Sequence, residues 1–80
     1  RDSLNIIGRN LRKYRKSQKI SQPELCKRLD LLGVTMYICD IYEIEYGKKT
    51  VKDFEALAFC KVLNITLDDL YSDTDQYYEA

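Results

Sequence analysis

The 80-residue chain has no histidine, no tryptophan and only one proline, and its 13 basic and 13 acidic side chains cancel. Histidine is the commonest metal ligand and the usual general base near neutral pH, so its absence argues against a zinc site and against most hydrolytic centres. The sequence also lacks a Gly-rich phosphate loop and any serine or cysteine beside an evident base. We therefore expect no enzymatic activity, no metal and no cofactor.

Cysteine is scarce, with residues at positions 26, 39 and 60 and no CxxC motif. Three cysteines are too few for a disulfide scaffold. Their odd number also fits a reducing cytoplasm, where we expect the protein to reside. Each cysteine has apolar neighbours at helical spacing, which predicts small buried hydrophobic side chains.

Long hydrophobic runs are absent as well, since no apolar stretch approaches the roughly 20 residues that cross a membrane. No secretory signal pattern is present. A chain of this size forms one small domain and buries only about 60% of its unfolded surface, which favours a compact helical core. We expect a soluble all-α protein that does not associate with a membrane.

The charge is unevenly distributed, because residues 1–20 carry seven basic and one acidic side chain while residues 51–80 carry two basic and seven acidic ones. Two interpretations stay open for the basic end, an anion-binding face or a solvated helix face. The cations concerned are Arg9, Arg12, Lys13, Arg15, Lys16 and Lys19.

Apolar residues at three- and four-residue spacing predict helices over 3–17, 22–32, 36–46 and 53–63, followed by a short helix that starts at Thr66 and ends near Tyr71. Their apolar stripes comprise Leu4, Ile7, Leu11 and Tyr14, then Leu25, Leu29 and Leu32, then Ile38, Ile41 and Ile44, then Ala56, Leu57, Phe59, Cys60 and Leu63, with Ile65 as a further core anchor. Beyond residue 71 we expect a frayed chain.

Capping signals mark the ends of these helices. Ser21 with Glu24, and Thr66 with Asp69, match the capping box that begins a helix. Gly33, Gly47 and Asn64 suit the left-handed conformation that ends one.

Four short motifs then appear in a fixed order along residues 5–71. They are Ile7-Gly8-x-x-Leu11-x-x-x-Arg15, Ser21-Gln22-x-x-Leu25, Ile41-x-x-Ile44-Glu45-x-Gly47 and Leu63-x-Ile65-x-x-x-x-Leu70. This order resembles the lambda-repressor-like helix-turn-helix domains of the Xre/Cro family. The resemblance implies a five-helix bundle with a helix-turn-helix DNA-binding domain over residues 1–71, followed by an acidic, tyrosine-containing tail over 72–80.

The resemblance also implies roles for individual residues. The third helix would enter the major groove of double-stranded DNA, with base-contact candidates at Tyr37, Ile38, Cys39, Tyr42 and Glu43. Gln22 would meet a phosphate, and Arg15 and Glu45 would form a structural pair between the first and third helices. More residues separate Gln22 from Glu45 along the sequence than is common in the family. Either the second helix or the turn after it is therefore longer than in typical members.

Further phosphate-contact candidates come from the residues themselves. Lys48 and Lys49 follow the expected stop at Gly47, where they would form either a basic loop that flanks the groove or a solvated turn, and Lys19 and Lys27 are weaker candidates. Apolar Tyr37 and Ile38 would touch thymine methyl groups, and Glu43 would accept from cytosine. Acidic Asp40 and Glu43 oppose binding to a polyanion unless nearby lysines offset them.

Two functions from different classes follow. The first is a sequence-specific DNA-binding transcriptional regulator, bacterial or phage-encoded and nucleoid-associated, that acts as a homodimer. Tyr71, Tyr77 and Tyr78 are candidates for its dimer surface, because aromatic residues are favoured at interfaces. The alternative is a protein-interaction module on the same bundle, which requires Ile38 and its aromatic neighbours to be exposed.

Overall fold

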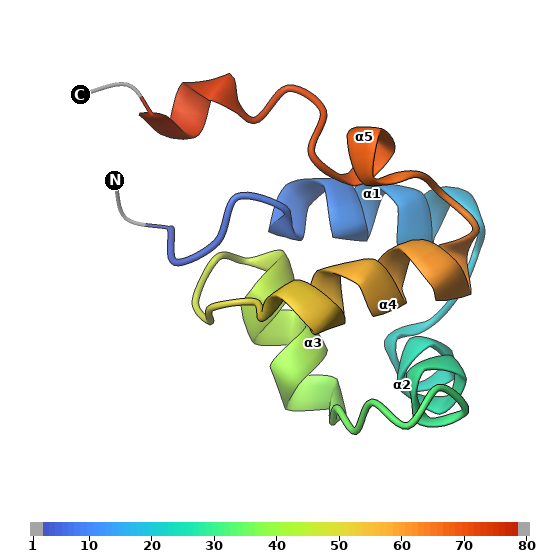
Figure 1. Cartoon of the computed structure of the whole chain (residues 1–80). Helices are drawn as coiled ribbons and strands as arrows, with labels where there is room; N and C mark the ends of the chain where they lie inside the picture. Colours follow the sequence, from blue (N-terminus) through green and yellow to red (C-terminus); the bar gives the residue numbers. More distant parts are fainter. Residues whose placement is uncertain (1–2, 79–80) are drawn as a thin grey trace.

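The computed structural model describes residues 3–78, and every regular element in that range is helical (Figure 1). The elements are α1 (Gly8–Ser17), α2 (Gln22–Asp30), α3 (Ile38–Glu45), α4 (Asp53–Leu63), α5 (Leu67–Leu70) and the 3-10 turn η1 (Asp75–Tyr78). The expectation of an all-α chain is therefore confirmed for these residues. None of these helices has both the length and the apolar character needed to cross a membrane.

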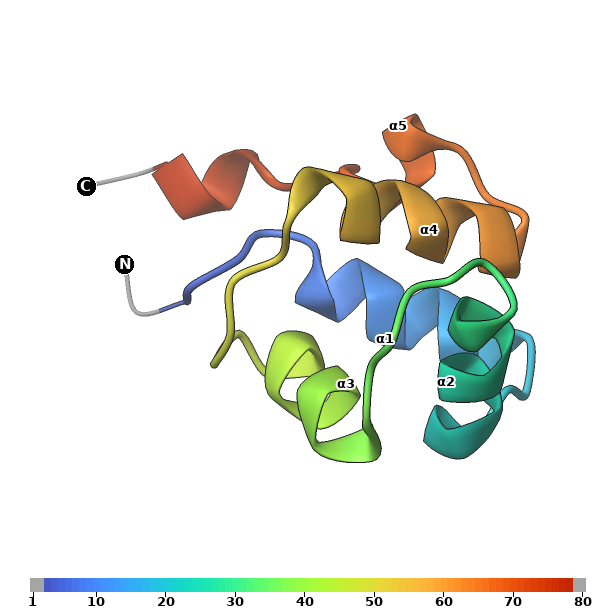
Figure 2. The ribbon, with the colours of Figure 1, turned by 60° about the horizontal axis from the view of Figure 1, so that its bottom comes forward.

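The helices surround one hydrophobic core. Helix α3 packs against α1 and α2, while α2 also packs against α4 (Figures 1 and 2). Helix α5 closes the opposite side, where it contacts α1 and α4. Every α-helix contributes at least one fully buried side chain, and Ile7 adds another just before α1. The largest buried side chains of the helices are Leu11, Leu25, Leu29, Ile41, Ile44, Phe59, Leu63 and Leu70. Ile65 packs against this cluster while partly buried.

The first helix begins at Gly8, five residues later than the apolar spacing predicts. The buried Asn5 side chain accepts hydrogen bonds from the backbone N–H groups of Ile7 at 3.0 Å and Gly8 at 2.7 Å. Its amide nitrogen donates to the carbonyls of Ile44 at 3.0 Å and Lys49 at 2.9 Å. Asn5 thus satisfies backbone N–H groups at the start of α1 and ties the start of α1 to the end of α3. Leu4 consequently lies outside the helix and is exposed.

Three further apolar residues lie outside the core, contrary to the prediction. One is Leu57 of α4, which is exposed. Helix α2 ends at Asp30, and the turn that follows, with Gly33 at φ +79°, leaves Leu32 exposed. Ile38 opens α3 and is 50% exposed, whereas Ile41 and Ile44 are fully buried. A strict three-residue repeat drifts about 60° per step around a helix, so three successive members do not share one buried face.

The residues after α5 are ordered through Ser72–Tyr78, which corrects the expectation of a frayed chain from residue 71 onward. The Asn10 amide donates to the carbonyls of Leu70 and Ser72, each at 2.8 Å. Thr74 is buried and donates to the Tyr71 carbonyl at 2.7 Å. These bonds hold the segment against α1 and lead it into η1. Residues 79–80 of the expected tail lie outside the described residues.

Side chains cap the helix starts at the predicted places. Ser21 accepts from the Glu24 backbone N–H, and Thr66 and Asp69 exchange both bonds of a capping box. The hydrogen bonds from Thr66 hold the pKa of the Asp69 carboxyl below its usual value. Gly33, Gly47 and Asn64 all adopt positive φ, as the predicted helix stops require.

The three cysteines differ in exposure. Cys60 is buried and Cys26 half-buried, but Cys39 lies on the exposed side of α3, which corrects the expectation of three buried side chains. Burial raises the pKa of the Cys60 and Cys26 thiols above the ordinary value. A raised thiol pKa and low exposure both slow reaction with an electrophile.

We expect iodoacetamide at pH 8 to modify Cys39 before either of the other cysteines. Accessibility decides the order, because the thiolate must reach the reagent. Peptide mass spectrometry of a time course measures the rates at the three sites, and a denatured sample serves as the control in which all three react. Early modification of Cys60 in the folded protein would contradict the described packing of α4.

Candidate partner-binding face on helix α3

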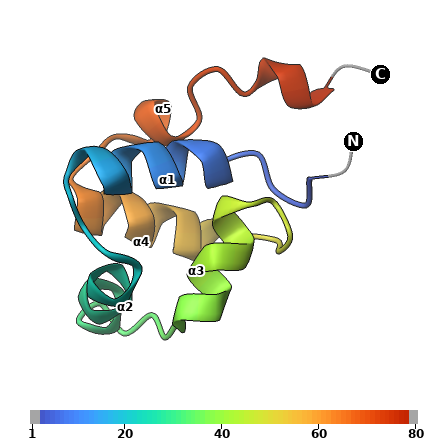
Figure 3. The ribbon, with the colours of Figure 1, turned by 180° about the vertical axis from the view of Figure 1, so that it is seen from behind.

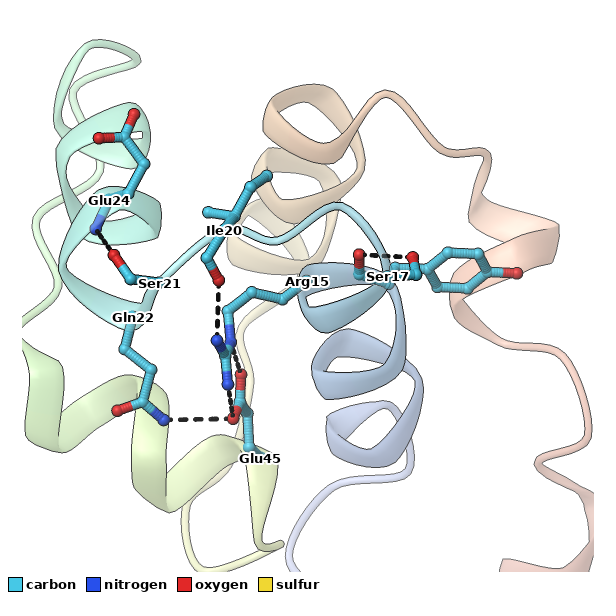
Figure 4. Close-up of polar contacts among 8 residues, drawn as sticks. Arg15, Ser17, Ile20, Ser21, Gln22, Glu24 and Glu45 are labelled. Carbon is cyan, nitrogen blue, oxygen red and sulfur yellow. Dashed lines mark hydrogen bonds and ion pairs between the residues drawn. The ribbon is translucent and has the colours of Figure 1, made fainter.

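A buried ion pair connects α1 to the end of α3 (Figure 4). Arg15 Nε donates to Glu45 Oε2 at 2.6 Å, and Arg15 Nη2 donates to Glu45 Oε1 at 3.0 Å. Arg15 Nη1 donates to the Ile20 carbonyl at 2.8 Å. The bidentate geometry joins the last turn of α1 to the end of α3 and to the turn before α2. The hydrogen bonds to Glu45 raise the pKa of Arg15 against the opposing effect of burial.

Gln22, at the start of α2, belongs to the same network. Its amide nitrogen donates to Glu45 Oε1 at 3.2 Å (Figure 4). The side chain is half-buried and directed toward Glu45. In this conformation its side-chain donor is engaged within the protein, and the backbone N–H groups of the first turn of α2 remain as the anion-attracting feature there.

The outer side of α3 exposes a band of aromatic and apolar side chains, which we call the α3 face. Tyr37 is 68% exposed, and Ile38, Tyr42 and Tyr46 are each about half exposed. Cys39 is also exposed, while Glu43 is half-buried. The five predicted base-contact candidates thus lie within one short helix and its N-cap, and Tyr46 extends the band by one turn. An exposed band of this composition is typical of a binding surface.

Cations lie beside the aromatic rings of this face. The rings of Tyr42 and Tyr46 are 4.8 Å apart between centroids. The Lys48 Nζ lies 5.9 Å from the Tyr42 centroid, and the Arg12 guanidinium lies 5.5 Å from that of Tyr46. Positive charge over an aromatic face is attracted by the ring quadrupole. The face therefore presents positive charge at the end of α3.

Nearby groups compensate the negative charge of the Asp40 carboxylate. It accepts a hydrogen bond from the Tyr37 backbone N–H at 2.8 Å, and the Lys49 Nζ lies 3.5 Å from its other oxygen. Asp40 therefore caps the N-terminus of α3 and pairs with the loop that follows the helix. Both roles reduce the negative charge that α3 presents, and they also engage Lys49 within the protein.

The remaining predicted phosphate contacts are more widely spread. Lys27 is exposed in the last turn of α2, which lies beside α3. Lys19 lies in the turn between α1 and α2, at the other end of α1 from the loop that contains Lys48 (Figure 1). Of the basic residues in the first quarter of the chain, Arg15 is withdrawn from any surface by its bond to Glu45.

Sequence reasoning missed three residues that shape this site. Tyr46 follows Tyr42 by four positions, a spacing that places two rings together on a helix and would have indicated it. Asn5 is a favoured capping residue, and this preference was its only local signal. Arg12 was recognised only as one of several cations, because its position over Tyr46 depends on how α1 crosses α3.

The described residues contain no cluster of three or more His, Cys, Asp or Glu side chains able to hold a metal. The features present are instead planar rings, adjoining cations and a helix held rigidly by a buried ion pair. Comparison of the chain with family models, with curated proteins and with solved structures gave no match.

Proposed function

We propose that the protein binds double-stranded DNA as a sequence-specific transcriptional regulator of the Xre/Cro type, with α2 and α3 as its helix-turn-helix and α3 in the major groove. The observation that carries the proposal is the α3 face, an exposed side of a short, rigidly held helix flanked by Lys48 and Lys49. The major groove of DNA accommodates an α-helix whose outer side is not covered by the rest of the protein. The seven residues between α2 and α3 form an extended turn in this arrangement.

Base contacts would come from the exposed residues of α3. Tyr37 and Ile38, at its N-terminal end, would offer apolar contact to thymine methyl groups, and Glu43 would accept from cytosine. Tyr42 would reach a base edge or a phosphate through its hydroxyl. Lys48 would contact the DNA backbone beside the groove, where phosphate contacts set the orientation of the protein.

Duplex DNA of random sequence is the first test, because phosphate neutralisation is independent of base sequence. If about four phosphates are neutralised, affinity should fall by about 100-fold between about 50 and 200 mM salt. The Lys48→Ala/Lys49→Ala variant should reduce the slope of log affinity against log salt by about one, because Lys48 is available to a phosphate whereas Lys49 pairs with Asp40. Fluorescence anisotropy with a labelled duplex measures both quantities.

Lys61→Ala provides the matched control, because Lys61 is an exposed lysine in the last turn of α4. Its slope should equal that of the unaltered protein. Equal losses in Lys61→Ala and in the double variant would indicate non-specific attraction. A lack of binding at about 50 mM salt would overturn the DNA proposal.

The second candidate is a protein-interaction module that uses the same α3 face. The exposure of Ile38 supports it, because this alternative required an apolar side chain at that position to be free. Tyrosine-rich, partly apolar surfaces are typical of protein interfaces. Absence of DNA binding with a correctly folded domain would favour this candidate.

We propose further that the regulator is a homodimer formed through a groove between α4 and α5. The groove has a volume of about 690 Å³, and its exposed apolar lining is Phe54, Leu57, Leu67 and Tyr71. Of the three tyrosines considered for the dimer surface, Tyr71 lines this groove, while Tyr77 faces α1. An isologous contact across such a surface would present two copies of α3 to successive half-sites.

Leu57→Glu is expected to convert the dimer to a monomer with little effect on folding, because Leu57 is 45% exposed and the new charge would be desolvated only in the interface. Sedimentation equilibrium measures the shift in mass. Leu31→Glu is the control, since Leu31 is 84% exposed and lies outside the groove. A monomeric unaltered protein at millimolar concentration would contradict the proposal.

A further inference from the structure

The N-terminal segment, the start of α1, the end of α3 and η1 lie at one end of the molecule (Figure 3). A second pocket is lined by residues of these four segments. Its volume is about 450 Å³, within the range of small-molecule sites. Three cations and two aromatic rings dominate the lining, namely Arg9, Arg12, Lys13, Tyr46 and Tyr77.

The three cations occupy positions i, i+3 and i+4 of α1 and therefore share one side of the helix. None of them lies within ion-pair distance of a carboxylate among residues 3–78, although Asp69 is near enough to Lys13 to interact with it electrostatically. Like charges at this spacing destabilise a helix. The first turn of α1 also has no acidic side chain to complement its dipole. A bound anion would relieve both effects.

The carboxylate that lines the pocket, Glu45, does not offset this charge. Both of its oxygens accept hydrogen bonds from Arg15, and one also accepts from Gln22. The Arg15–Glu45 pair is therefore internally neutral. The net charge facing the pocket comes from Arg9, Arg12 and Lys13.

The aromatic rings suggest what else the ligand carries. Tyr46 lies on the α3 side of the pocket with Arg12 over its ring, and Tyr77 of η1 lines the pocket from the opposite part of the chain. Planar groups stack on tyrosine rings and on guanidinium planes. Arginine forks are suited to phosphate oxygens, which they bind in a bidentate manner.

We propose that this pocket binds a phosphorylated small molecule with a planar aromatic ring, of the size of a mononucleotide. The phosphate would contact Arg9 and Lys13, and the ring would stack near Tyr46 and Tyr77. The inference does not depend on DNA binding by the α3 face, because a single phosphate and one ring are sufficient to fill the pocket.

Isothermal titration with adenosine 5′-monophosphate, in the absence of DNA, tests the proposal. We expect saturable binding with one site per chain. Adenosine, which lacks the phosphate, should bind at least about tenfold more weakly, since a hydrogen bond to a charged group contributes about that factor. Inorganic phosphate, which lacks the ring, should also bind at least about tenfold more weakly, because stacking of a base on an aromatic side chain contributes about that factor. Equal binding of phosphate alone would overturn the role given to the ring.

Matched variants separate a built site from general attraction. Arg9→Gln should weaken binding of the mononucleotide by about tenfold, whereas Lys16→Gln removes an exposed cation of α1 that does not line the pocket and should leave it unchanged. Tyr77→Leu should weaken binding of the mononucleotide but not that of phosphate. Circular dichroism confirms that each variant is folded. Equal losses in Arg9→Gln and Lys16→Gln, or no saturable binding to the unaltered protein, would overturn the proposal.

Discussion

Arg15→Met is expected to lower the free energy of unfolding by about 3–5 kcal/mol, because it leaves the Glu45 carboxylate buried without its charged partner. The Glu45 side chain is fully buried and that of Arg15 is 9% exposed, so solvent screens the pair very little. A domain of this length has roughly 4–12 kcal/mol of stability, so the loss is a large part of the total. The Tm should fall by about 12–40 °C.

Urea denaturation followed by circular dichroism measures this loss, and the chain offers a matched control. Arg28→Met breaks the i,i+4 pair with Glu24, whose side chains are 41% and 43% exposed. Its cost should stay below about 0.5 kcal/mol because water screens the pair. A similar cost for the two variants would show that the Arg15–Glu45 pair is not desolvated as described.

The double variant Arg15→Met/Glu45→Leu should recover at least half of the loss, since replacement of a whole buried pair by apolar residues is often close to neutral. Recovery of stability without recovery of partner binding would show that the pair orients α3. Recovery of both would show that packing alone positions the helix. In either case the measurement separates the stability of the domain from the placement of its α3 face.

Gly8→Ala is expected to destabilise the protein by about 2–3 kcal/mol, although alanine is the better helix former by about 1 kcal/mol. The reason is tertiary, because a methyl group at Gly8 would collide with the Ile44 carbonyl oxygen at the end of α3. Backbone atoms cannot move aside as a flexible side chain can. The substitution would therefore force α1 and α3 apart and disturb the two Asn5 hydrogen bonds at their junction.

Gly33→Ala is the comparison for this effect. No heavy atom lies within 4 Å of a methyl group there, so only the strain of φ +79° opposes the change, at a cost of about 1 kcal/mol. Thermal unfolding of both variants measures the difference. A stabilising effect of Gly8→Ala would contradict the close approach of the two helices.

The amino-acid sequence was enough to predict most of the local structure. The apolar spacing places Leu11, Leu25 and Leu63 in the core, and all three are fully buried. The capping signals at Ser21 and Thr66 mark helix starts that the structure contains. These features are predictable because they depend on residues within one turn of each other, where spacing along the chain determines spacing in three dimensions.

Other features depend on how the helices cross, and the sequence did not determine them. Ile38 lies outside the core because α1 and α2 cover the side of α3 that bears Ile41 and Ile44. Cys39 is exposed for the same reason. Periodicity shows that a helix has an apolar side, but the neighbouring helices decide how much of that side is covered.

The candidate sites divide in the same way. The sequence of each helix is enough to place the aromatic residues on α3 and the cations on α1, because helical spacing determines where residues of one helix lie relative to one another. Only the tertiary structure brings Arg12 over Tyr46, joins Lys49 to Asp40 and places Tyr77 beside α1. The contacts of Arg12 and Tyr77 connect residues that are far apart in the chain, so they exist only because packing of the shared core sets the positions of the helices. The contact of Lys49 depends on how the loop after α3 folds back along that helix.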